Sequence, residues 1–386
     1  MNIILTDHQE RDHLLPLTYT RPVAKLRVGL FTIEEKWQRM AADATISFKA
    51  QDYMSKVFPE KDADDNLYVN GAAIPTIELI QELIGLADGE SLYQGEAWIA
   101  TRSASKLTEM PASGSELNAE VKIISRSWRI FQWNGEEITS DLALVRNNGS
   151  SAAVPDGVTL IGDDIFIEEG ATLRPCTINT ETGPVYIGKN AEVMEGSLVR
   201  GPFALMNDSV LKMGAKIYGA TTIGPHSKVG GEVNNCVIFG YSNKAHDGFI
   251  GNSVIGEWCN LGADTNTSNL KNNYAVVKVH NYALNRSEST ESQFCGLMMA
   301  ETAKAGINTM FNTGTVCGVF ANVIGAGFPH RRIPDFGWGG AEGFKSYRLN
   351  DALEVARIVM SRRSIELTDD IRDMYTHVHE LVSAES

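Results

Sequence analysis

The sequence has few cysteines, no long apolar run and no excess of basic residues. Its five cysteines are spread over 386 residues without a C-x-x-C pair, so neither a zinc ribbon nor a redox-active dithiol is expected. No apolar stretch approaches the length of a membrane span, and the start of the chain lacks the basic segment and long apolar region of a signal peptide. We therefore expect a cytoplasmic protein without a membrane partner.

The charge balance is acidic, with a formal net charge of −14 and an isoelectric point near 5.1. A chain with this balance is repelled by phosphate backbones and by anionic lipid surfaces. We expect no nucleic-acid partner. A site for a nucleotide or a sugar phosphate would need local cations within the acidic background.

The length of the chain indicates two or three domains, because 386 residues exceed what one ordinary core supports. Residues 147–157, NNGSSAAVPDG, are polar, contain glycine and proline, and lack a periodic apolar face. We place a domain boundary there and predict three parts: residues 1–150, 151–340 and 341–386.

Apolar residues spaced six apart dominate the middle part. This spacing fits neither a helix nor a single strand and is typical of short strands stacked as a parallel β-solenoid. The uninterrupted run comprises Ile187, Val193, Val199, Leu205, Leu211, Ile217, Ile223 and Val229. Shorter runs comprise Ile161, Ile167 and Leu173, then Phe249, Ile255 and Leu261, and then Ala305, Phe311, Cys317 and Val323. We expect all these side chains to face the inside of the coils.

The two flanking parts show other patterns. In the first, strand-like segments at residues 2–6, 67–69 and 97–100 alternate with helical patterns at 32–42 and 76–85, as in an open, parallel-rich α/β sheet. After the repeats, residues 328–334 and 336–340 look irregular. Residues 349–383 have helical spacing and are expected to cap the solenoid or to pack on a neighbour.

An α/β domain followed by six-residue repeats resembles the bifunctional enzymes that are N-acetylglucosamine-1-phosphate uridylyltransferases and glucosamine-1-phosphate N-acetyltransferases. The resemblance implies a reduced nucleotidyltransferase-like domain with a mixed or parallel sheet, a left-handed parallel β-helix and C-terminal helices. Residues 244–263, KAHDGFIGNSVIGEWCNLGA, resemble the acetyltransferase motif of that family, with His246 and Asn260 on its histidine and asparagine positions. The resemblance implies that His246 is the general base, which suits neutral imidazole. Asn260 would hold the thioester oxygen. For both residues the alternative is an ordinary polar residue of a coil.

Further substrate contacts follow from the same resemblance. Phe249 stands where the family usually has a tyrosine, Asn269 matches an asparagine of the substrate pocket, and Tyr218 replaces a basic residue, so Lys244 is a candidate replacement cation. Acetyl-CoA is the implied co-substrate. Residues 303–308, AKAGIN, resemble the coil beside it, and Lys304 and Arg331 are candidates for its phosphates.

The N-terminal part resembles the opening segment of the nucleotidyltransferase half. Arg11, Arg21 and Lys25 are its candidate ligands for a nucleotide or sugar phosphate, the alternative being an ordinary charged surface. The glycine loop that wraps phosphates in the family is replaced by residues 7–11, DHQER. Mg²⁺ is possible, but its usual aspartate is replaced by Asn70, and no other metal ligand is identified.

Three functions remain open. The first is an acyltransferase of amino-sugar metabolism that acts on a sugar phosphate or nucleotide sugar, which is the function we favour. The second is a working sugar-1-phosphate nucleotidyltransferase whose solenoid serves assembly, and the third is a non-catalytic binding scaffold. The resemblance also implies a homotrimer with an acetyl site between subunits.

Overall fold

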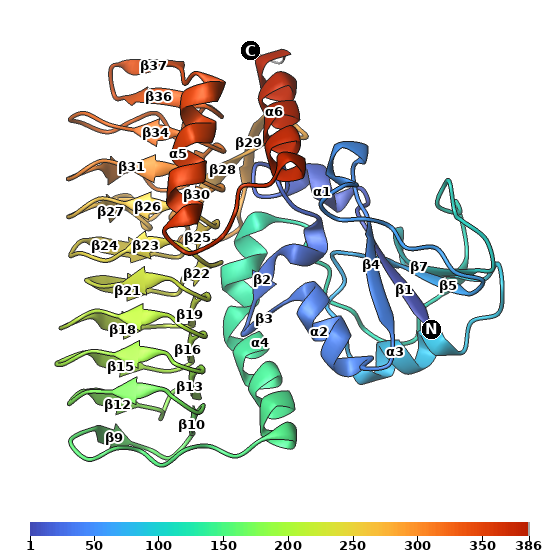
Figure 1. Cartoon of the computed structure of the whole chain (residues 1–386), viewed down its shortest axis with the longest axis horizontal. Coiled ribbons are helices and arrows are strands. Elements are labelled where there is room, and N and C mark those ends of the chain that lie inside the picture. The colour runs from blue at the N-terminus through green and yellow to red at the C-terminus, as the bar shows by residue number, and fades with distance from the viewer. Residues whose placement is uncertain (385–386) are drawn as a thin grey trace.

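The computed structural model describes residues 1–384. Figure 1 shows a column of stacked coils beside an α/β domain, with two helices at the C-terminal end of the column. The expected fold class, an α/β domain followed by a parallel β-helix and terminal helices, is confirmed.

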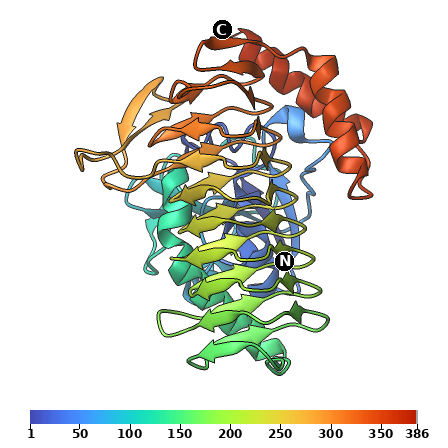
Figure 2. The ribbon, with the colours of Figure 1, turned by 90° about the vertical axis from the view of Figure 1, so that its left-hand side faces the viewer.

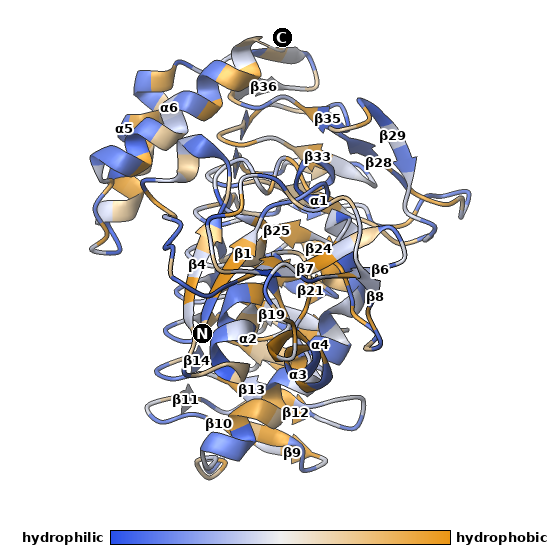
Figure 3. Ribbon diagram, turned by 90° about the vertical axis from the view of Figure 1, so that its right-hand side faces the viewer, coloured by the Kyte–Doolittle hydropathy of each residue, from blue (hydrophilic) through white to orange (hydrophobic). Residues whose placement is uncertain are grey.

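The N-terminal domain contains a six-stranded mixed sheet. Its strands in spatial order are β4 (Thr45–Lys49), β1 (Asn2–Thr6), β5 (Asn66–Asn70), β7 (Ala97–Ser103), β6 (Ser91–Gln94) and β8 (Ser115–Glu116). Strands β4, β1 and β5 run parallel, so their carboxyl ends meet at one edge of the sheet. All five residues of β1 are buried, as a central strand requires, and Figure 3 shows the apolar colouring of this sheet.

The remaining elements of the domain are short, apart from one helix. They are α1 (Glu10–His13), α2 (Ile33–Met40), α3 (Ile77–Ile84), α4 (Ser127–Asn148), the 3₁₀ turns η1 (Val23–Lys25) and η2 (Asp52–Met54), and the hairpin of β2 (Arg27–Val28) and β3 (Phe31–Thr32). Helix α2 begins with a capping box, in which the Thr32 hydroxyl accepts from the Glu35 amide and the Glu35 carboxylate accepts from the Thr32 amide. The strands and helices expected between residues 2 and 100 all lie where the sequence predicted them.

The solenoid has three faces. One face packs against helix α4 and is called the docked face. It comprises β10 (Ile165–Ile167), β13 (Val185–Ile187), β16 (Phe203–Leu205), β19 (Thr221–Ile223), β22 (Val237–Ile238), β25 (Val254–Ile255), β30 (Leu297–Met299), β33 (Thr315–Cys317) and β35 (Arg332–Ile333). The second face comprises β11 (Thr172–Leu173), β14 (Glu192–Val193), β17 (Val210–Leu211), β20 (Lys228–Val229), β23 (Asn243–Lys244), β26 (Asn260–Leu261), β31 (Lys304–Ala305), β34 (Asn322–Val323), β36 (Gly337–Gly340) and β37 (Gly343–Ser346). The third face comprises β9 (Thr159–Ile161), β12 (Thr177–Asn179), β15 (Leu198–Arg200), β18 (Lys216–Tyr218), β21 (Glu232–Asn234) and β24 (Phe249–Gly251), followed by the pair β27 (Asn266–Thr267) and β32 (Met310–Phe311).

The six-residue register predicts the interior of the coils, with two exceptions. All eight residues of the uninterrupted run are at most 3% exposed. Ile161 and Phe249 are wrong: Ile161 is 39% exposed and Phe249 is half-buried, whereas their neighbours Leu160 and Ile250 take the interior column. Coils of unequal length shift the register by one residue, and a shift of one turns a side chain to the other face.

The last coils are more regular than the sequence suggested. Residues 328–340 were expected to be irregular, yet they contain β35 and β36, which continue the docked and second faces. Ile333 stacks on Cys317 inside the coil and is fully buried. The prolines and glycines around it hide this single apolar position from a periodicity argument.

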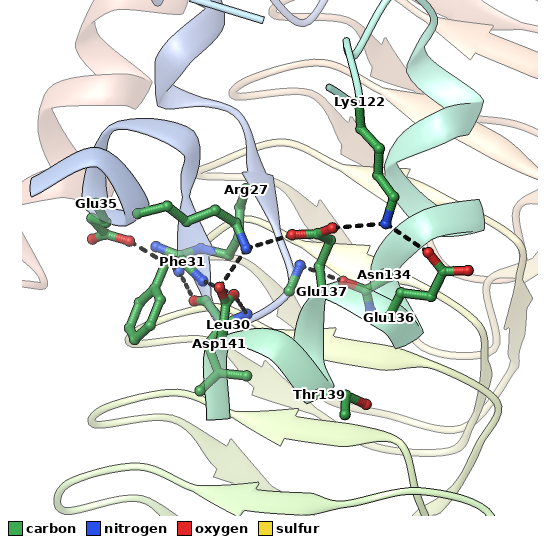
Figure 4. Close-up of polar contacts among 12 residues, drawn as sticks. Arg27, Leu30, Phe31, Glu35, Lys122, Asn134, Glu136, Glu137, Thr139 and Asp141 are labelled. Atoms are coloured by element: carbon green, nitrogen blue, oxygen red, sulfur yellow. Dashed lines mark hydrogen bonds and ion pairs between the residues drawn. The ribbon is translucent and has the colours of Figure 1, made fainter. Parts of the chain in front are cut away.

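Helix α4 joins the two parts along the docked face. It packs against β16, β19, β22 and β25, and its glycine Gly135 faces Ala220. Figure 4 shows Glu137 and Asp141 of α4 projecting toward the turn that carries Leu30. The buried Lys36 ammonium donates to both carboxylates, and the Leu30 amide donates to Asp141 at 2.8 Å.

Two further segments bridge the domain and the solenoid. An insertion between β27 and β30 forms the hairpin of β28 (Lys278–Asn281) and β29 (Arg286–Ser289), and Arg126 of the N-terminal domain forms a bidentate ion pair with Glu288 on it. Helices α5 (Leu349–Ser361) and α6 (Asp369–Ala384) lie beside the upper coils, as Figure 2 shows. Helix α6 also contacts η2. None of the helices in residues 1–384 combines the length and apolarity that a membrane crossing demands.

Candidate functional site

A cavity of about 690 Å³ lies at the carboxyl edge of the N-terminal sheet. Arg11 follows β1 and Tyr53 follows β4, and both line it; its other walls include Tyr282 from the tip of the inserted hairpin and His377 from α6. Ligands of open α/β sheets bind outside the carboxyl ends of the parallel strands. The cavity occupies that position, and three distant segments of the chain enclose it.

Arg11 is the arginine of this cavity wall, which also contains the acids Asp12 and Asp52. Its side chain is 8% exposed, and its guanidinium donates to the Tyr53 hydroxyl at 2.9 Å and to the Asp12 carboxylate at 2.7 Å. The Tyr53 ring stacks on His377 with 4.7 Å between ring centroids. Burial raises the pKa of Tyr53 to about 12. Its hydroxyl accepts from Arg11 and donates to the Tyr19 carbonyl at 2.7 Å.

The other two predicted cations of this domain point elsewhere. The buried Arg21 guanidinium donates to Glu301 at 2.6 Å and lies 3.1 Å from the Glu257 carboxylate, and both of these acids belong to the solenoid. Lys25 pairs with Glu34 in its own domain. Arg11, Arg21 and Lys25 therefore do not form the single phosphate-binding cluster that the sequence suggested.

The magnesium position implied by the resemblance does not fit a hard cation. Asn70 ends β5 and is fully buried. Its side-chain amide donates to the Trp98 carbonyl at 3.0 Å, and its side-chain oxygen accepts from the Ala72 amide at 2.9 Å. Both ends of the side chain are thus occupied by backbone. Within residues 1–384 no group of three or more His, Cys, Asp or Glu side chains has the geometry of a metal site.

The predicted acetyl-transfer pair lies on neighbouring coils. His246 is exposed on the corner that follows β23, and Asn260 is exposed on β26, where its backbone pairs with that of Asn243. Both side chains face solvent and are open to a substrate or to a neighbouring copy. The structure places them on the same part of the column, and their catalytic roles stay predictions.

Lys244 lies inside the coil rather than on its surface. It takes the interior column between Val229 and Leu261, is 2% exposed, and donates to the backbone carbonyls of Gly230 at 3.0 Å and His246 at 2.7 Å. Burial lowers its pKa to about 8. In this position its amine holds the corner that carries His246. Its predicted contact with substrate phosphate would require the amine to leave these two carbonyls.

Phe249 and Asn269 converge over Gly251 on the third face. A Cβ added to Gly251 would lie 2.5 Å from the Asn269 amide nitrogen and 2.6 Å from the Phe249 ring, so a larger residue there would displace the ends of these two side chains. The Asn269 amide donates to Asn252 at 2.7 Å. Tyr218 lies two coils earlier on this face, and its hydroxyl donates to Glu232. Phe249 and Asn269 therefore form a local pair that Tyr218 does not join.

The two candidates for the coenzyme lie on different faces. Lys304 is on β31 of the second face, next to Asn260, and its amine donates to the Thr302 carbonyl at 2.8 Å. Burial lowers the pKa of Lys304. Arg331 is exposed just before β35 of the docked face. Within one chain the structure does not bring Lys304 and Arg331 together.

Sequence reasoning missed the acids that receive the N-terminal domain. Glu257 and Glu301 follow the interior residues Ile255 and Met299 by two positions and therefore occupy the same corner of successive coils. Tyr375 of α6 also donates to Glu301, at 3.1 Å. The sequence did contain a signal for these acids, because each follows an interior residue of its coil by two positions. The long insertion between them concealed it.

Comparisons with known proteins agree with this architecture. Residues 3–149 match the family model of sugar nucleotidyl transferases. The chain is 27% identical over 228 residues to a bifunctional protein GlmU of Methanocaldococcus jannaschii, covering 58% of this chain and 48% of that protein. It is 28% identical over 162 residues to the GlmU of Synechococcus elongatus, covering 38% and 34%, and 33% identical over 139 residues to that of Acholeplasma laidlawii, covering 32% and 30%. The matched segments thus span about half or less of each relative. The resemblance to the bifunctional amino-sugar enzymes is confirmed at these sequence identities and over these partial lengths.

Solved structures give weaker similarities. A hexapeptide transferase family protein from Anaplasma phagocytophilum shares 13% identity at a TM-score of 0.25, covering 59% of this chain and 94% of that one. An Arabidopsis UDP-N-acetylglucosamine acyltransferase shares 12% identity at a TM-score of 0.20, covering 56% and 79%. TM-scores of this size do not establish a common overall fold.

Proposed function

We propose that this protein is a transferase of amino-sugar nucleotide metabolism that transfers an acetyl group from acetyl-CoA to the amine of a sugar phosphate or nucleotide sugar. The observation that carries the proposal is the corner of His246. An exposed imidazole stands there on a backbone held by a buried lysine, in a segment that resembles the acetyltransferase motif. The similarity to bifunctional GlmU proteins supports the same class of reaction.

In the proposed reaction His246 removes a proton from the amine of the sugar. The amine nitrogen attacks the thioester carbonyl and a C–N bond forms. The C–S bond then breaks, and the leaving sulfur takes the proton from protonated His246, so that coenzyme A is released as a thiol. Asn260, on the adjacent coil, would donate a hydrogen bond to the oxygen that gains charge in the transition state. The stacked coils supply a rigid frame that holds base and substrate in register.

A second candidate function is sugar-1-phosphate nucleotidyl transfer in the N-terminal domain, with the solenoid serving assembly. The match of residues 3–149 to sugar nucleotidyl transferases and the cavity at the carboxyl edge of the sheet favour it. The loop of residues 7–11 and the engaged Asn70 do not favour it, because they remove the glycine backbone and the acid that such chemistry uses. A third candidate, a scaffold that binds sugar nucleotides without turnover, predicts binding alone.

We also propose that the active form is a homotrimer in the cytoplasm. Helix α4 and the N-terminal domain cover the docked face, whereas the third face carries Leu198 and Tyr218, which are 52% and 36% exposed. These two side chains line a shallow groove of about 420 Å³ together with Ile161 and Lys216. An apolar groove on a rigid sheet suits contact with a second copy of the chain.

Separate assays of two activities, acetyl transfer and nucleotidyl transfer, test the proposal. Thiol release from acetyl-CoA over a panel of amino-sugar 1-phosphates and nucleotide amino sugars measures acetyl transfer, and pyrophosphate release from nucleoside triphosphates measures nucleotidyl transfer. We expect thiol release with at least one acceptor. Pyrophosphate release alone would support the second candidate, and ligand binding without either product would support the third.

A further inference from the structure

A single arginine of the N-terminal domain contacts three successive coils of the solenoid. The guanidinium carbon of the buried Arg21 lies 5.5 Å from the centre of the Phe239 ring. The same guanidinium lies 3.1 Å from the Glu257 carboxylate and 2.6 Å from the Glu301 carboxylate. These three residues follow β22, β25 and β30, which stack on one another in the docked face. Each of them therefore lies at the corner where its coil passes from the docked face to the second face.

The same three coils carry the residues predicted for acetyl transfer. Beyond this corner the chain enters the second face, where β23 leads to His246, β26 begins with Asn260 and β31 begins with Lys304. Each of the two glutamates is three residues away from the predicted side chain of its own coil. The second-face strands of these coils are only two residues long, so the corner before each strand has a large share in fixing where its side chains lie.

The backbone of these corners has an unfavourable conformation. In each of the three coils one corner residue has a positive φ, which is 52° at Tyr241, 60° at Trp258 and 59° at Thr302. Aromatic and β-branched residues seldom adopt this left-handed conformation, and it persists only where the surrounding structure enforces it. Two lower coils have Asn190 and Asp208 at the same position, and these residue types tolerate the conformation. The contacts of Arg21 thus stabilise corners that need external support.

Neighbouring residues of the N-terminal domain strengthen this support. The Arg27 Nε donates to the Phe239 carbonyl at 3.1 Å, and the Thr20 hydroxyl donates to the Glu301 carboxylate at 2.5 Å. Both contacts are buried, so the domain holds the backbone of the first coil as well as the carboxylate of the third.

We propose that Arg21 is a positioning residue for acetyl transfer: it fixes the corners before β23, β26 and β31, so that the solenoid needs the docked N-terminal domain to align His246 and Asn260 with their substrate. The inference rests on the proposed function, because it concerns the residues of that reaction. It goes further by making the N-terminal domain a structural part of the acetyl-transfer site, whatever that domain binds in its own cavity.

The thiol-release assay on Glu257→Gln tests this role, because Arg21 keeps its other carboxylate partner in that variant. We expect kcat to fall about tenfold or more and the KM values to change less than about threefold, since a displaced Asn260 weakens binding of the transition state alone. Glu288→Gln is the matched control. It frees Arg126, also of the N-terminal domain, from the inserted hairpin and not from these coils, so kcat should change less than about threefold.

The same substitution in an Asn260→Ala background separates positioning from general destabilisation. If Glu257 acts through Asn260, then Glu257→Gln causes no further loss of kcat once Asn260 is removed. A loss that persists undiminished in this background would overturn the proposal, as would full activity of the single variant Glu257→Gln.

Hydrogen exchange followed by mass spectrometry keeps the two proposals separate, because it needs no turnover. In Glu257→Gln and in Arg21→Lys, which keeps the charge but loses the guanidinium, we expect faster amide exchange in residues 256–263. Exchange should be unchanged in residues 203–211, two coils before Phe239.

Faster exchange in a protein that releases no thiol with any acceptor would refute the transferase function and leave the support of these corners in place. Exchange at the wild-type rate in both variants would overturn the role of Arg21 even where acetyl transfer is observed. Circular dichroism of each variant confirms that its fold is retained.

Discussion

Arg21 of the N-terminal domain and Glu301 of the solenoid form a buried ion pair with 2.6 Å between guanidinium and carboxylate. Thr20 and Tyr375 donate to the same carboxylate, so the N-terminal domain and the C-terminal helix meet at one acid of one coil. Glu257 lies 3.1 Å from the same guanidinium. Burial alone would raise the pKa of Glu257, but Arg21 outweighs it and holds that pKa below its ordinary value. Tyr19 and His377, which line the N-terminal cavity, are close in sequence to Thr20 and Tyr375 of this junction.

Removing Arg21 is expected to destabilise the protein strongly. In Arg21→Met the buried Glu301 carboxylate and the partly buried Glu257 carboxylate lose their cation, and breaking a buried pair in this way costs about 3–5 kcal/mol. Urea unfolding followed by circular dichroism measures the change. Arg357→Met is the matched control, because Arg357 pairs with Glu354 on the surface of α5 and such pairs contribute about 1 kcal/mol or less. Equal losses in the two variants would contradict the role given to the junction.

Asp7 is expected to make stability depend on pH. Burial raises its pKa to about 7 from an ordinary value of 3.8, so between these values the folded state binds more protons than the unfolded state. Stability therefore falls as the pH rises from about 4 to about 7. Asp7→Asn removes this cost, which is about 4 kcal/mol at full ionisation from the size of the shift. The variant should be more stable relative to wild type at pH 8 than at pH 4.5.

Thermal unfolding at the two pH values gives this comparison. The control is Asp43→Asn, an exposed aspartate of the same domain, which should show no such change. A stability difference between Asp7→Asn and wild type that is the same at both pH values would refute a buried, neutral Asp7.

Lys244 is expected to show the opposite dependence. Burial lowers its pKa from 10.5 to about 8, so between these values the unfolded state binds more protons and stability rises with pH. The free energy of unfolding of Lys244→Met, relative to that of wild type, should therefore fall by up to about 3 kcal/mol between pH 7 and pH 10.5. Chemical unfolding at both pH values measures it, with Lys228→Met as an exposed control on the preceding coil. A difference that does not change with pH would place the Lys244 amine in solvent.

The oligomeric state is a separate prediction. A trimer has three times the 42.2 kDa mass of the chain, which light scattering coupled to gel filtration resolves directly. Leu198→Asp places a charge on the exposed groove of the third face and is expected to shift the mass toward the monomer. A monomeric wild type would contradict both the assembly and a site shared between subunits.

Periodicity predicted the fold well because each coil repeats the same physical requirement. A spacing of six places one interior side chain on each of the three faces, and residues three repeats apart, such as Ile187 and Leu205, stack directly in successive coils. It failed at Ile161 and Phe249, where corners of different length shift the register. It also hid Lys244, since a lysine in the interior column does not look like a core residue.

The candidate sites were harder to predict because they depend on contacts between distant segments. Arg11 and Arg21 are ten residues apart in the same N-terminal segment, yet one lines the cavity and the other crosses to Glu301. The direction in which each arginine side chain points depends on the positions of the acidic residues of the solenoid. The local sequence around the arginines does not encode those positions. The composition of residues 7–11 did indicate a loss of phosphate-binding backbone, but not that single buried atoms of these side chains would make no hydrogen bond.

The most direct test of the proposed function is thiol release from acetyl-CoA by the wild type and by His246→Ala, with the acceptor on which the wild type is most active. His226→Ala is the matched control, because His226 is also a partly exposed histidine of a coil corner and stacks on Tyr241 instead. We predict that His246→Ala lowers kcat by about 10²–10⁴-fold, the usual contribution of a general base, while His226→Ala changes it less than threefold. Full activity in His246→Ala would contradict the proposed mechanism, and a wild type that releases no thiol with any acceptor would contradict the acetyltransferase function itself.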